Sequence, residues 1–285
     1  MTQNIVLFQY MGGKSRFTPQ IKPYIPLSIS HYVEPFCGSA ALFFSNENGW
    51  SNSEVLNDTN GDIINFFRVL RQGPDRFAWL AKYTPFSRDE FYVALKIIRS
   101  GEGSPECRAL AFYISRVQSI MGAGISWTGS STSEKNETLR QANKELLLLR
   151  AAERLKNAIL DNLPYQKIID KYDGPNTFFY IDPPYLSLKD NSMTERAYRG
   201  GFFGENDHLE LLELIQKLQG YVILSGYDHP IYAEINKEWH RIVIPSHVKT
   251  PESQHETEEI ILINQKCYQD KIQRDSKIKQ MRLEI

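Results

Sequence analysis

Residues 177–185 read Thr-Phe-Phe-Tyr-Ile-Asp-Pro-Pro-Tyr, and this stretch decides the fold. The apolar run 177–181 lies between Gly174-Pro175 and Asp182-Pro183, which is typical of a buried strand in a parallel sheet. Ligands of open α/β sheets bind outside the carboxyl ends of the strands. We therefore expect Asp182 and the three residues after it to lie at a binding site.

Strands and helices alternate on both sides of this stretch. Six further strands are predicted, at 31–33, 54–56, 158–160, 221–224, 239–244 and 259–263. The last two are joined too closely for a crossover helix, so we expect them to pair antiparallel. The pattern indicates an α/β fold with a doubly wound, mostly parallel sheet of seven strands.

A mainly helical insert, residues 67–156, separates the second strand from the third. Pro74, Pro85 and Pro105 stand near the starts of successive helices. The Gly-, Ser- and Thr-rich region near 122–137 is predicted to be a loop or hairpin, and a long helix is expected from about 139 to 156. The chain then divides into a core domain, 1–66 and 157–270, this insert, and a basic tail, 271–285.

The composition is that of a globular protein, with 41% apolar and 24% charged residues and a net charge of −1. No apolar stretch is long enough to span a bilayer, and the N-terminal residues lack the layout of a secretion signal. Cys37, Cys107 and Cys267 form no C-x-x-C pair. We expect a cytoplasmic protein with free thiols and neither a metal site nor a membrane partner.

Charge is unevenly distributed along the chain. Residues 108–157 carry eight Lys and Arg against four Glu, and the segments 1–33 and 264–285 are also basic. Segregated charge of this kind permits a basic face that binds a polyanion. Chance clustering on solvated helices is the alternative.

In the corner Asp182-Pro183-Pro184-Tyr185, the ionised Asp182 side chain and the Pro183 carbonyl offer hydrogen-bond acceptors and no donor. Consecutive prolines fix the backbone and remove two N–H groups. The carboxylate of Asp182 and the carbonyl of Pro183 therefore suit a group with two N–H bonds, such as an exocyclic amine. Tyr185 adds a flat face on which a ring can stack.

A second motif, Glu34-Pro-Phe-Cys-Gly-Ser-Ala-Ala41, connects the first strand to a helix. The small residues from Gly38 allow a ligand to approach the backbone at the helix start. Asp58 follows about 20 residues later, at the end of the second strand, where a carboxylate accepts hydrogen bonds from ribose hydroxyls. The pair points to a cofactor that contains adenosine.

A third motif, Tyr10-Met-Gly-Gly-Lys-Ser15, invites comparison with a phosphate-binding loop. That loop requires a glycine where this chain has Phe8, so a nucleoside triphosphatase is disfavoured. The two glycines still form a flexible turn that places Lys14 against a carboxylate.

Taken together, the order of these motifs resembles that of the Dam-type DNA adenine methyltransferases over most of the chain. The resemblance implies a methyl donor, S-adenosylmethionine, and no metal. It implies cofactor contacts from the first motif, from the loop after the first strand, from the acid after the second and from an aromatic residue after the third. In this sequence these are Tyr10, Lys14, Glu34, Pro35, Phe36, Gly38, Asp58, Tyr165 and Asp182.

The resemblance also implies transfer of the methyl group to N6 of an adenine flipped out of DNA. Asp182, Pro183, Pro184 and Tyr185 are then the catalytic residues, and the core domain is the catalytic domain. We expect the insert to recognise the target, with DNA contacts from Arg116, Trp127, Lys135 and Arg140. The substrate is expected to be double-stranded DNA, bound by a monomer.

Three departures from the family pattern limit what carries over. The cofactor loop F-x-G-x-G reads Phe36-Cys-Gly-Ser-Ala40, and because alanine disfavours a positive φ we expect this loop to differ. The usual S-N-x-D after the fifth strand reads Ser225-Gly-Tyr-Asp228, and the usual Asn-Arg of the insert reads Ser115-Arg116. These departures leave the role of Asp228 and the recognition sequence open.

Other functions remain compatible with the sequence. Cytosine N4, RNA adenine and a glutamine side chain are alternative methyl acceptors with nearly the same chemistry. A nucleic-acid-binding or antirestriction protein that has lost activity is a further alternative. For His208, at the start of an apolar helix, a capping or core-edge role is expected rather than catalysis.

Overall fold

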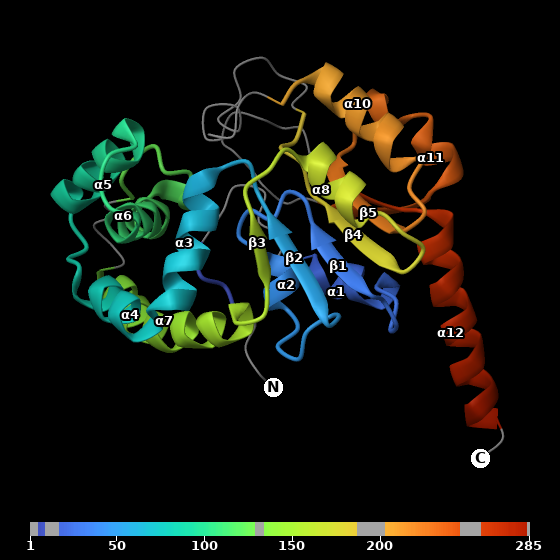
Figure 1. The fold of residues 1–285 in the computed structure, drawn as a ribbon, viewed down its shortest axis with the longest axis horizontal. Coiled ribbons are helices and arrows are strands. Elements are labelled where there is room, and N and C mark those ends of the chain that lie inside the picture. The colour runs from blue at the N-terminus through green and yellow to red at the C-terminus, as the bar shows by residue number, and fades with distance from the viewer. Residues whose placement is uncertain (1–4, 9–16, 129–133, 187–202, 246–257, 284–285) are drawn as a thin grey trace. The chain divides into compact units, whose positions relative to one another are not determined.

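The computed structural model describes residues 5–8, 17–128, 134–186, 203–245 and 258–283 (Figure 1). Seven strands form one sheet in the order β3-β2-β1-β4-β5-β7-β6. All seven predicted strands are present, and their ends differ from the prediction by at most three residues. The strands are β1 His31–Glu34, β2 Ser53–Asn57, β3 Ile159–Asp161, β4 Thr177–Ile181, β5 Tyr221–Tyr227, β6 His240–Pro245 and β7 Glu258–Ile263.

The central strand β4 is buried along its whole length, as its apolar sequence predicts. It pairs in parallel with β1 on one side and with β5 on the other. β7 pairs antiparallel with both β5 and β6. The predicted antiparallel pair is therefore confirmed, and β7 rather than β6 lies next to β5.

The described residues fold into two compact units. The first comprises 1–16, 37–49 and 56–164, and the second 17–36, 50–55 and 165–285. The helices and 3-10 turns are α1 Thr18–Ile21, η2 Lys22–Tyr24, α2 Ala41–Phe44, α3 Gly61–Gln72, α4 Pro74–Tyr83, α5 Arg88–Ser100, α6 Pro105–Val117, η3 Ile120–Gly122, α7 Glu134–Leu155, α8 Tyr165–Tyr172, α10 Glu205–Ile215, η4 Pro230–Tyr232, α11 Ile235–Glu238 and α12 Gln265–Leu283.

The helices α3 to α7 lie in the first unit, where α6 packs against α3 and α5 and α7 packs against α3 and α4. Phe66 forms the centre of their core, because its ring contacts those of Phe8, Phe77 and Phe112. The predicted loop near 122–137 is too long at its end, since α7 begins at Glu134. Glutamate is a good helix former and is favourable in a first turn, which explains the early start.

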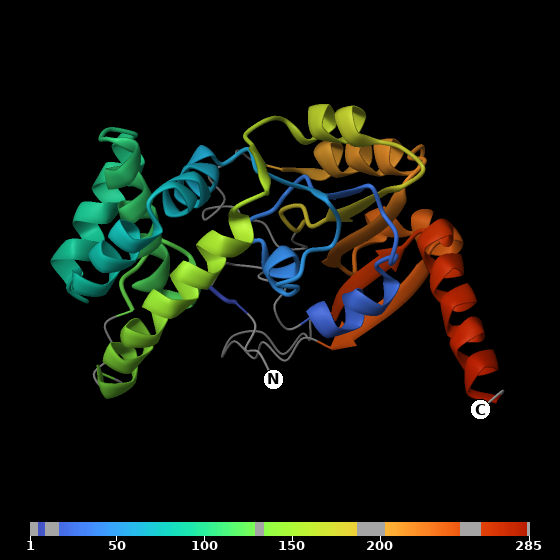
Figure 2. The same ribbon diagram turned by 60° about the horizontal axis from the view of Figure 1, so that its bottom comes forward.

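In the second unit, α8 and α10 lie side by side (Figure 2), joined by a hydrogen bond of 3.0 Å from Gln166 to Glu210. The basic stretch 271–285 belongs largely to α12, whose Tyr268 stacks on His240 at 4.0 Å between ring centroids. Within the described ranges, no helix combines the length and the apolar character needed to cross a membrane.

Candidate active site

The corner Asp182-Pro183-Pro184-Tyr185 follows β4 directly, as the sequence predicts. Ser225 of β5 donates a hydrogen bond of 2.8 Å from Oγ to Oδ1 of the half-buried Asp182. The hydroxyl groups of Tyr180 and Ser225 lie 3.1 Å apart, so a buried chain of hydroxyls leads to the carboxylate. This chain fixes the orientation of Asp182 at the carboxyl end of the strand.

Tyr185 is held at its hydroxyl and at its ring. The hydroxyl donates to Oε2 of Glu259 at 3.3 Å, and the ring lies edge to face with Tyr227 at 4.6 Å between centroids. The side chain is 8% exposed. Burial, with the charges of Asp182 and Glu259, raises the pKa of Tyr185 well above its usual value, so its hydroxyl stays protonated.

Three aromatic rings of the second unit form a cluster. Phe36, near the start of the loop after β1, lies 5.1 Å from Tyr165 and 5.6 Å from Phe203 between ring centroids. The hydroxyl of Tyr165 is buried and has no hydrogen-bond partner within the described part of the chain. Burial raises its pKa to about 12. Aromatic rings beside one unpaired donor suit a planar heterocycle.

Glu34 is a buried acid at the end of β1, with 1% of its surface exposed. Tyr32 donates a hydrogen bond of 2.5 Å from its hydroxyl to Oε1 of Glu34. A buried carboxylate is costly unless it is hydrogen-bonded. This hydrogen bond therefore fixes Glu34, the residue directly before Pro35 and Phe36.

The loop after β1 continues in the first unit with two residues of positive φ. Gly38 has φ +48° and Ala40 has φ +52°; Ala40 is the one described residue other than glycine with a positive φ. Ala40 therefore adopts a positive φ, although alanine disfavours it. The Ala40 N–H donates to the Cys37 carbonyl at 2.6 Å, and the Ala40 carbonyl accepts from Phe44, so the tight turn and the start of α2 impose this conformation.

Asp58, just after β2, is buried and accepts two backbone hydrogen bonds. Gly38 N–H donates to Oδ2 at 3.0 Å and Asn60 N–H donates to Oδ1 at 2.9 Å. Burial raises the pKa of Asp58 to about 6, although the two amide donors lower it. Gly38 and Asp58, which are 20 residues apart in the sequence, are therefore hydrogen-bonded to each other.

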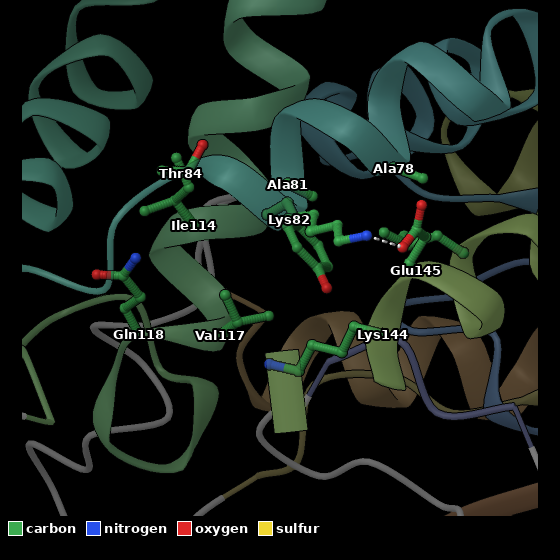
Figure 3. Close-up of a pocket in the computed structure, with 11 residues that line it drawn as sticks. Ala78, Ala81, Lys82, Thr84, Ile114, Val117, Gln118, Lys144 and Glu145 are labelled. Carbon is green, nitrogen blue, oxygen red and sulfur yellow. Dashed lines mark hydrogen bonds and ion pairs between the residues drawn. The ribbon is translucent and has the colours of Figure 1, made fainter. Parts of the chain in front are cut away.

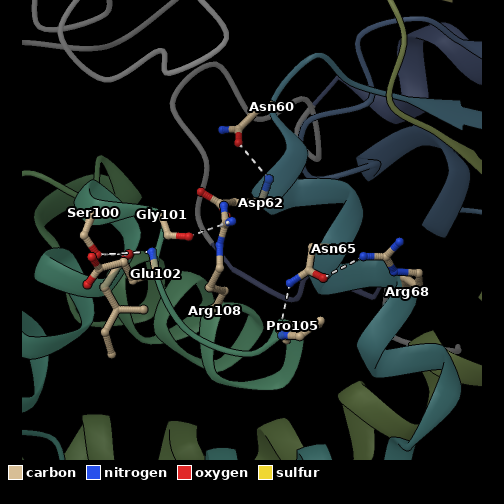
Figure 4. A network of polar contacts seen from close by, with 10 residues as sticks. Asn60, Asp62, Asn65, Arg68, Ser100, Gly101, Glu102, Pro105 and Arg108 are labelled. Atoms are coloured by element: carbon tan, nitrogen blue, oxygen red, sulfur yellow. Dashed lines mark hydrogen bonds and ion pairs between the residues drawn. The ribbon is translucent and has the colours of Figure 1, made fainter.

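A polar network joins the start of α3 to α6 (Figure 4). Asn60 caps α3 by accepting from the Asp62 N–H at 3.1 Å, and its Nδ2 is buried without a partner in the described residues. Arg108 of α6 donates to Oδ1 of Asp62 at 2.5 Å and to the Gly101 carbonyl at 3.1 Å. The start of α3 is therefore fixed to α6.

Arg116 has a structural role that its charge does not predict. Its side chain is 5% exposed, and Nη1 donates to the carbonyl groups of Gly122 and Ala123 at 3.1 and 2.9 Å. To reach a phosphate it would have to break both hydrogen bonds. This burial opposes the DNA contact expected of Arg116.

The other residues expected to bind DNA are placed less fully. Trp127 packs against Phe86 and below the guanidinium of Arg88, which lies 5.1 Å from its ring centroid. Lys135 and Arg140 lie on α7, in the part whose side chains the structure does not describe. Tyr10 and Lys14 lie outside the described residues.

One small cavity lies between α4, α6 and α7 (Figure 3). Its volume is about 10 Å³, which is space for about one water molecule. Lys82 and Glu145 form an ion pair of 2.7 Å across its wall. The described residues hold no group of three or more His, Cys, Asp or Glu side chains suited to a metal ion.

Several supporting residues escape the sequence reasoning. Phe203 and Glu259 have no motif around them, and nothing short of the fold brings Phe203 to the aromatic cluster or Glu259 to Tyr185. The capping or core-edge role expected of His208 does not predict its hydrogen bond to the Pro184 carbonyl. Ser225 stands in the altered S-N-x-D motif, which is the one signal that points to it. Asp228 of the same motif pairs with Arg241 at 2.8 Å and thus braces β6.

Comparisons with known proteins agree with this arrangement. The model of the D12 class N6 adenine-specific DNA methyltransferase family matches residues 10–250. A type II methyltransferase of Lactococcus lactis subsp. cremoris is 25% identical over 248 residues, 81% of this chain and 84% of that protein. A DNA adenine methylase of Haemophilus influenzae is 25% identical over 275 residues, 90% and 92% of the two chains, and one of Serratia marcescens is 24% identical over 251 residues, 85% and 88%.

Proposed function

The chain belongs to the D12 class of N6 adenine-specific DNA methyltransferases, and on that premise we propose which of its residues carry out the reaction. Its function is to methylate N6 of adenine in DNA, as the resemblance in the sequence predicts. The family supports this function and not the alternatives of cytosine N4, RNA adenine or a scaffold without activity.

Members of this family use S-adenosylmethionine, which supplies the methyl group on a sulfonium sulfur. By the resemblance, we propose that Asp58 of the first unit accepts hydrogen bonds from the ribose hydroxyls and that Phe36 and Tyr165 of the second unit flank the adenine ring. Each unit also holds one buried donor without a partner among the described residues, Asn60 Nδ2 in the first and the Tyr165 hydroxyl in the second, and each donor suits an acceptor of a ligand. The resemblance adds cofactor contacts from Tyr10, Lys14, Glu34, Pro35, Gly38 and Asp182.

The observation that carries the catalytic proposal is the hydrogen bond from Ser225 that orients the Asp182 carboxylate at the corner. We propose that Asp182 and the Pro183 carbonyl accept hydrogen bonds from the two N–H groups of the target amine. The nitrogen lone pair is then withdrawn from the ring and directed at the methyl carbon. Catalysis arises mainly from positioning and from electrostatic stabilisation, and Pro184 keeps the backbone of the corner rigid.

The target adenine must leave the duplex before it reaches the corner. Extrusion costs a few kcal/mol, and stacking on an aromatic ring returns roughly 1–3 kcal/mol. We propose that Tyr185, held by Glu259 and Tyr227, is the ring on which the base stacks. Because the hydroxyl and the ring edge of Tyr185 are already held in place, its side chain loses less conformational entropy when the base binds.

We propose that the insert binds DNA through α7 and the loop before it, with Lys135 and Arg140 at phosphates and Trp127 beside them. Alanine at Lys135 or Arg140 is expected to weaken DNA binding and to reduce the salt slope by about 1 for each lost contact. Lys237, an exposed lysine paired with Glu234 in the second unit, serves as the control. An unchanged dependence of DNA affinity on salt in both variants would show that these side chains of α7 do not contact DNA.

We propose that the protein acts as a monomer on double-stranded DNA. The test is methylation of unmethylated duplex DNA and of the same DNA after denaturation, with labelled S-adenosylmethionine and analysis of the nucleosides. The duplex is expected to yield N6-methyladenine faster than the single strands. Label in cytosine would contradict the adenine specificity, and equal rates would contradict the duplex preference.

A further inference from the structure

His208, on α10, is buried next to the catalytic corner of the second unit. None of its surface is exposed, and Nε2 lies 3.0 Å from the carbonyl oxygen of Pro184. On the other side of the ring, Nδ1 lies 3.2 Å from the hydroxyl of Tyr232, itself 1% exposed. The imidazole thus connects a buried tyrosine to the backbone of the corner.

The chemistry of these partners fixes the tautomer of His208. A carbonyl oxygen only accepts, so Nε2 carries the proton and donates to Pro184. Nδ1 of a neutral ring is then an acceptor, and the Tyr232 hydroxyl donates to it. Burial lowers the pKa of His208 to about 4, so the ring is neutral near pH 7.

Gly226 of β5 makes room for this arrangement. A Cβ atom at position 226 would lie 3.0 Å from the Tyr232 hydroxyl oxygen and 3.3 Å from two carbons of its ring. The chain has this glycine in the position where the S-N-x-D pattern has asparagine. The absence of a side chain at position 226 therefore leaves the space that the buried Tyr232 occupies.

His208 also touches the aromatic cluster. Its ring lies edge-on to Phe203 at 4.8 Å between centroids, and Phe203 packs against Tyr165 at 5.9 Å. One side chain therefore contacts both the corner and the cluster in this unit. The Pro184 carbonyl belongs to the peptide group between Pro184 and Tyr185, so holding it limits rotation of the backbone at the end of the corner.

We propose that His208 is a positioning residue for methyl transfer, which keeps the Pro184 carbonyl fixed and thereby the acceptors of Asp182 and Pro183. The proposal rests on the proposed role of the corner. Tyr232 fixes the tautomer, and Gly226 leaves space for Tyr232. Neither residue touches the substrate in this scheme.

The test compares His208→Leu with His208→Gln in the full chain, by single-turnover methylation of unmethylated genomic DNA at saturating S-adenosylmethionine. Glutamine can donate to Pro184 and accept from Tyr232, whereas leucine fills the space without polar groups. We expect leucine to slow transfer about 10- to 100-fold, the loss typical of misplaced reacting groups, and glutamine to remain within about fivefold. His240→Gln, at a half-buried histidine on β6, is the control and should match the wild type.

A residue with only a packing role would give the opposite order, because leucine suits a buried site at least as well as glutamine. Wild-type rates in the leucine variant, or equal losses in both variants, would overturn the proposal. If the leucine variant does not fold, Tyr232→Phe replaces it, with an expected loss of about two- to tenfold. Full activity in a folded Tyr232→Phe variant would count against the proposal.

A second readout does not depend on methyl transfer. In ¹⁵N-histidine NMR spectra at pH 7, His208 should carry its proton on Nε2, and Tyr232→Phe should shift the Nδ1 signal. A proton on Nδ1 would overturn the proposal even if the enzyme is active. If the wild-type chain forms no N6-methyladenine, the proposed function is contradicted instead. The tautomer of His208 seen by NMR then remains as the test of the positioning proposal.

Discussion

Asp58 and Asp182 are the two acids assigned to the reaction, and the protein holds them in different ways. Asp58 receives both of its hydrogen bonds from backbone N–H groups, of Gly38 and Asn60. Asp182 receives a hydrogen bond from a side chain, the hydroxyl of Ser225. The first arrangement is set by backbone conformation, and the second depends on a residue 43 positions away in the sequence.

Because the two acids are held differently, different experiments test their roles. Backbone donors at Asp58 survive most changes of side chain, so its environment is best altered through pH or through the backbone. The hydrogen bond from Ser225 to Asp182 is removed by deleting one hydroxyl. We therefore expect side-chain substitutions around Asp182 to change the rate of transfer, and perturbations around Asp58 to change cofactor affinity.

The largest effect is expected for Asp182→Ala. Loss of the acceptor should lower kcat by at least about 10³-fold, comparable with the loss of a catalytic hydrogen-bonding group, while the affinity for S-adenosylmethionine changes less. Asp58→Ala is the matched variant and should mainly weaken that affinity. Single-turnover rates and calorimetry measure the two quantities. If both variants lose affinity and rate to the same extent, the proposed division of roles between the two acids is wrong.

The second effect concerns the pH dependence of cofactor binding. The pKa of Asp58 is about 6 in the folded protein, so the carboxyl is protonated below that pH. Ribose hydroxyls donate better to the ionised form, so binding should release a proton and the affinity should fall about tenfold for each pH unit below 6. Affinity should be nearly constant above pH 7.

Calorimetry between pH 5 and pH 8, in buffers of different ionisation enthalpy, measures this proton release. Asp58→Asn cannot ionise and should bind weakly with a flat profile over the same range. A wild-type profile without a change near pH 6 would show that Asp58 is not the group that titrates on binding.

A smaller effect is expected for Ser225→Ala. Without the hydroxyl, Asp182 loses a donor of 2.8 Å, and Tyr180 loses the hydroxyl 3.1 Å away. The loss of one hydrogen bond to a charged group corresponds to about 1.5–3 kcal/mol, so kcat should fall about 10- to 100-fold. Ser225→Thr keeps the hydroxyl and serves as the control. A kcat within twofold of the wild type in Ser225→Ala would show that the hydroxyl does not orient Asp182.

The same contrast explains how far the sequence predicts the structure. The strands depend on local patterns, and they are confirmed. The roles of the corner after β4 and of the pair Gly38 and Asp58 rest on short motifs and stay predictions. Ser225, Glu259 and His208 reach the corner from β5, β7 and α10, and a single sequence carries no signal for such distant contacts. The burial of Arg116 could not be predicted for a related reason, because charge alone does not tell a buried guanidinium from an exposed one.

The smallest effect is expected at Ala40, where the backbone itself is tested. Its φ of +52° costs alanine about 1–2 kcal/mol relative to a right-handed conformation. The next residue, Ala41, is the first residue of the helix α2 and carries no such cost. Ala40→Gly relieves that strain but loses a buried methyl group, worth roughly 0.8 kcal/mol, and makes the unfolded chain more flexible. Its free energy of unfolding should therefore stay within about 1 kcal/mol of the wild type.

Ala41→Gly relieves no backbone strain and should lower the free energy of unfolding by about 1 kcal/mol. Ala40 is fully buried and Ala41 is half-buried, so burial alone would make the substitution at Ala40 the more damaging one. Urea unfolding of the two variants decides between burial and strain. A greater loss at Ala40 would mean that the loop after β1 holds its left-handed turn without appreciable strain, and that the alanine is as well suited to it as glycine.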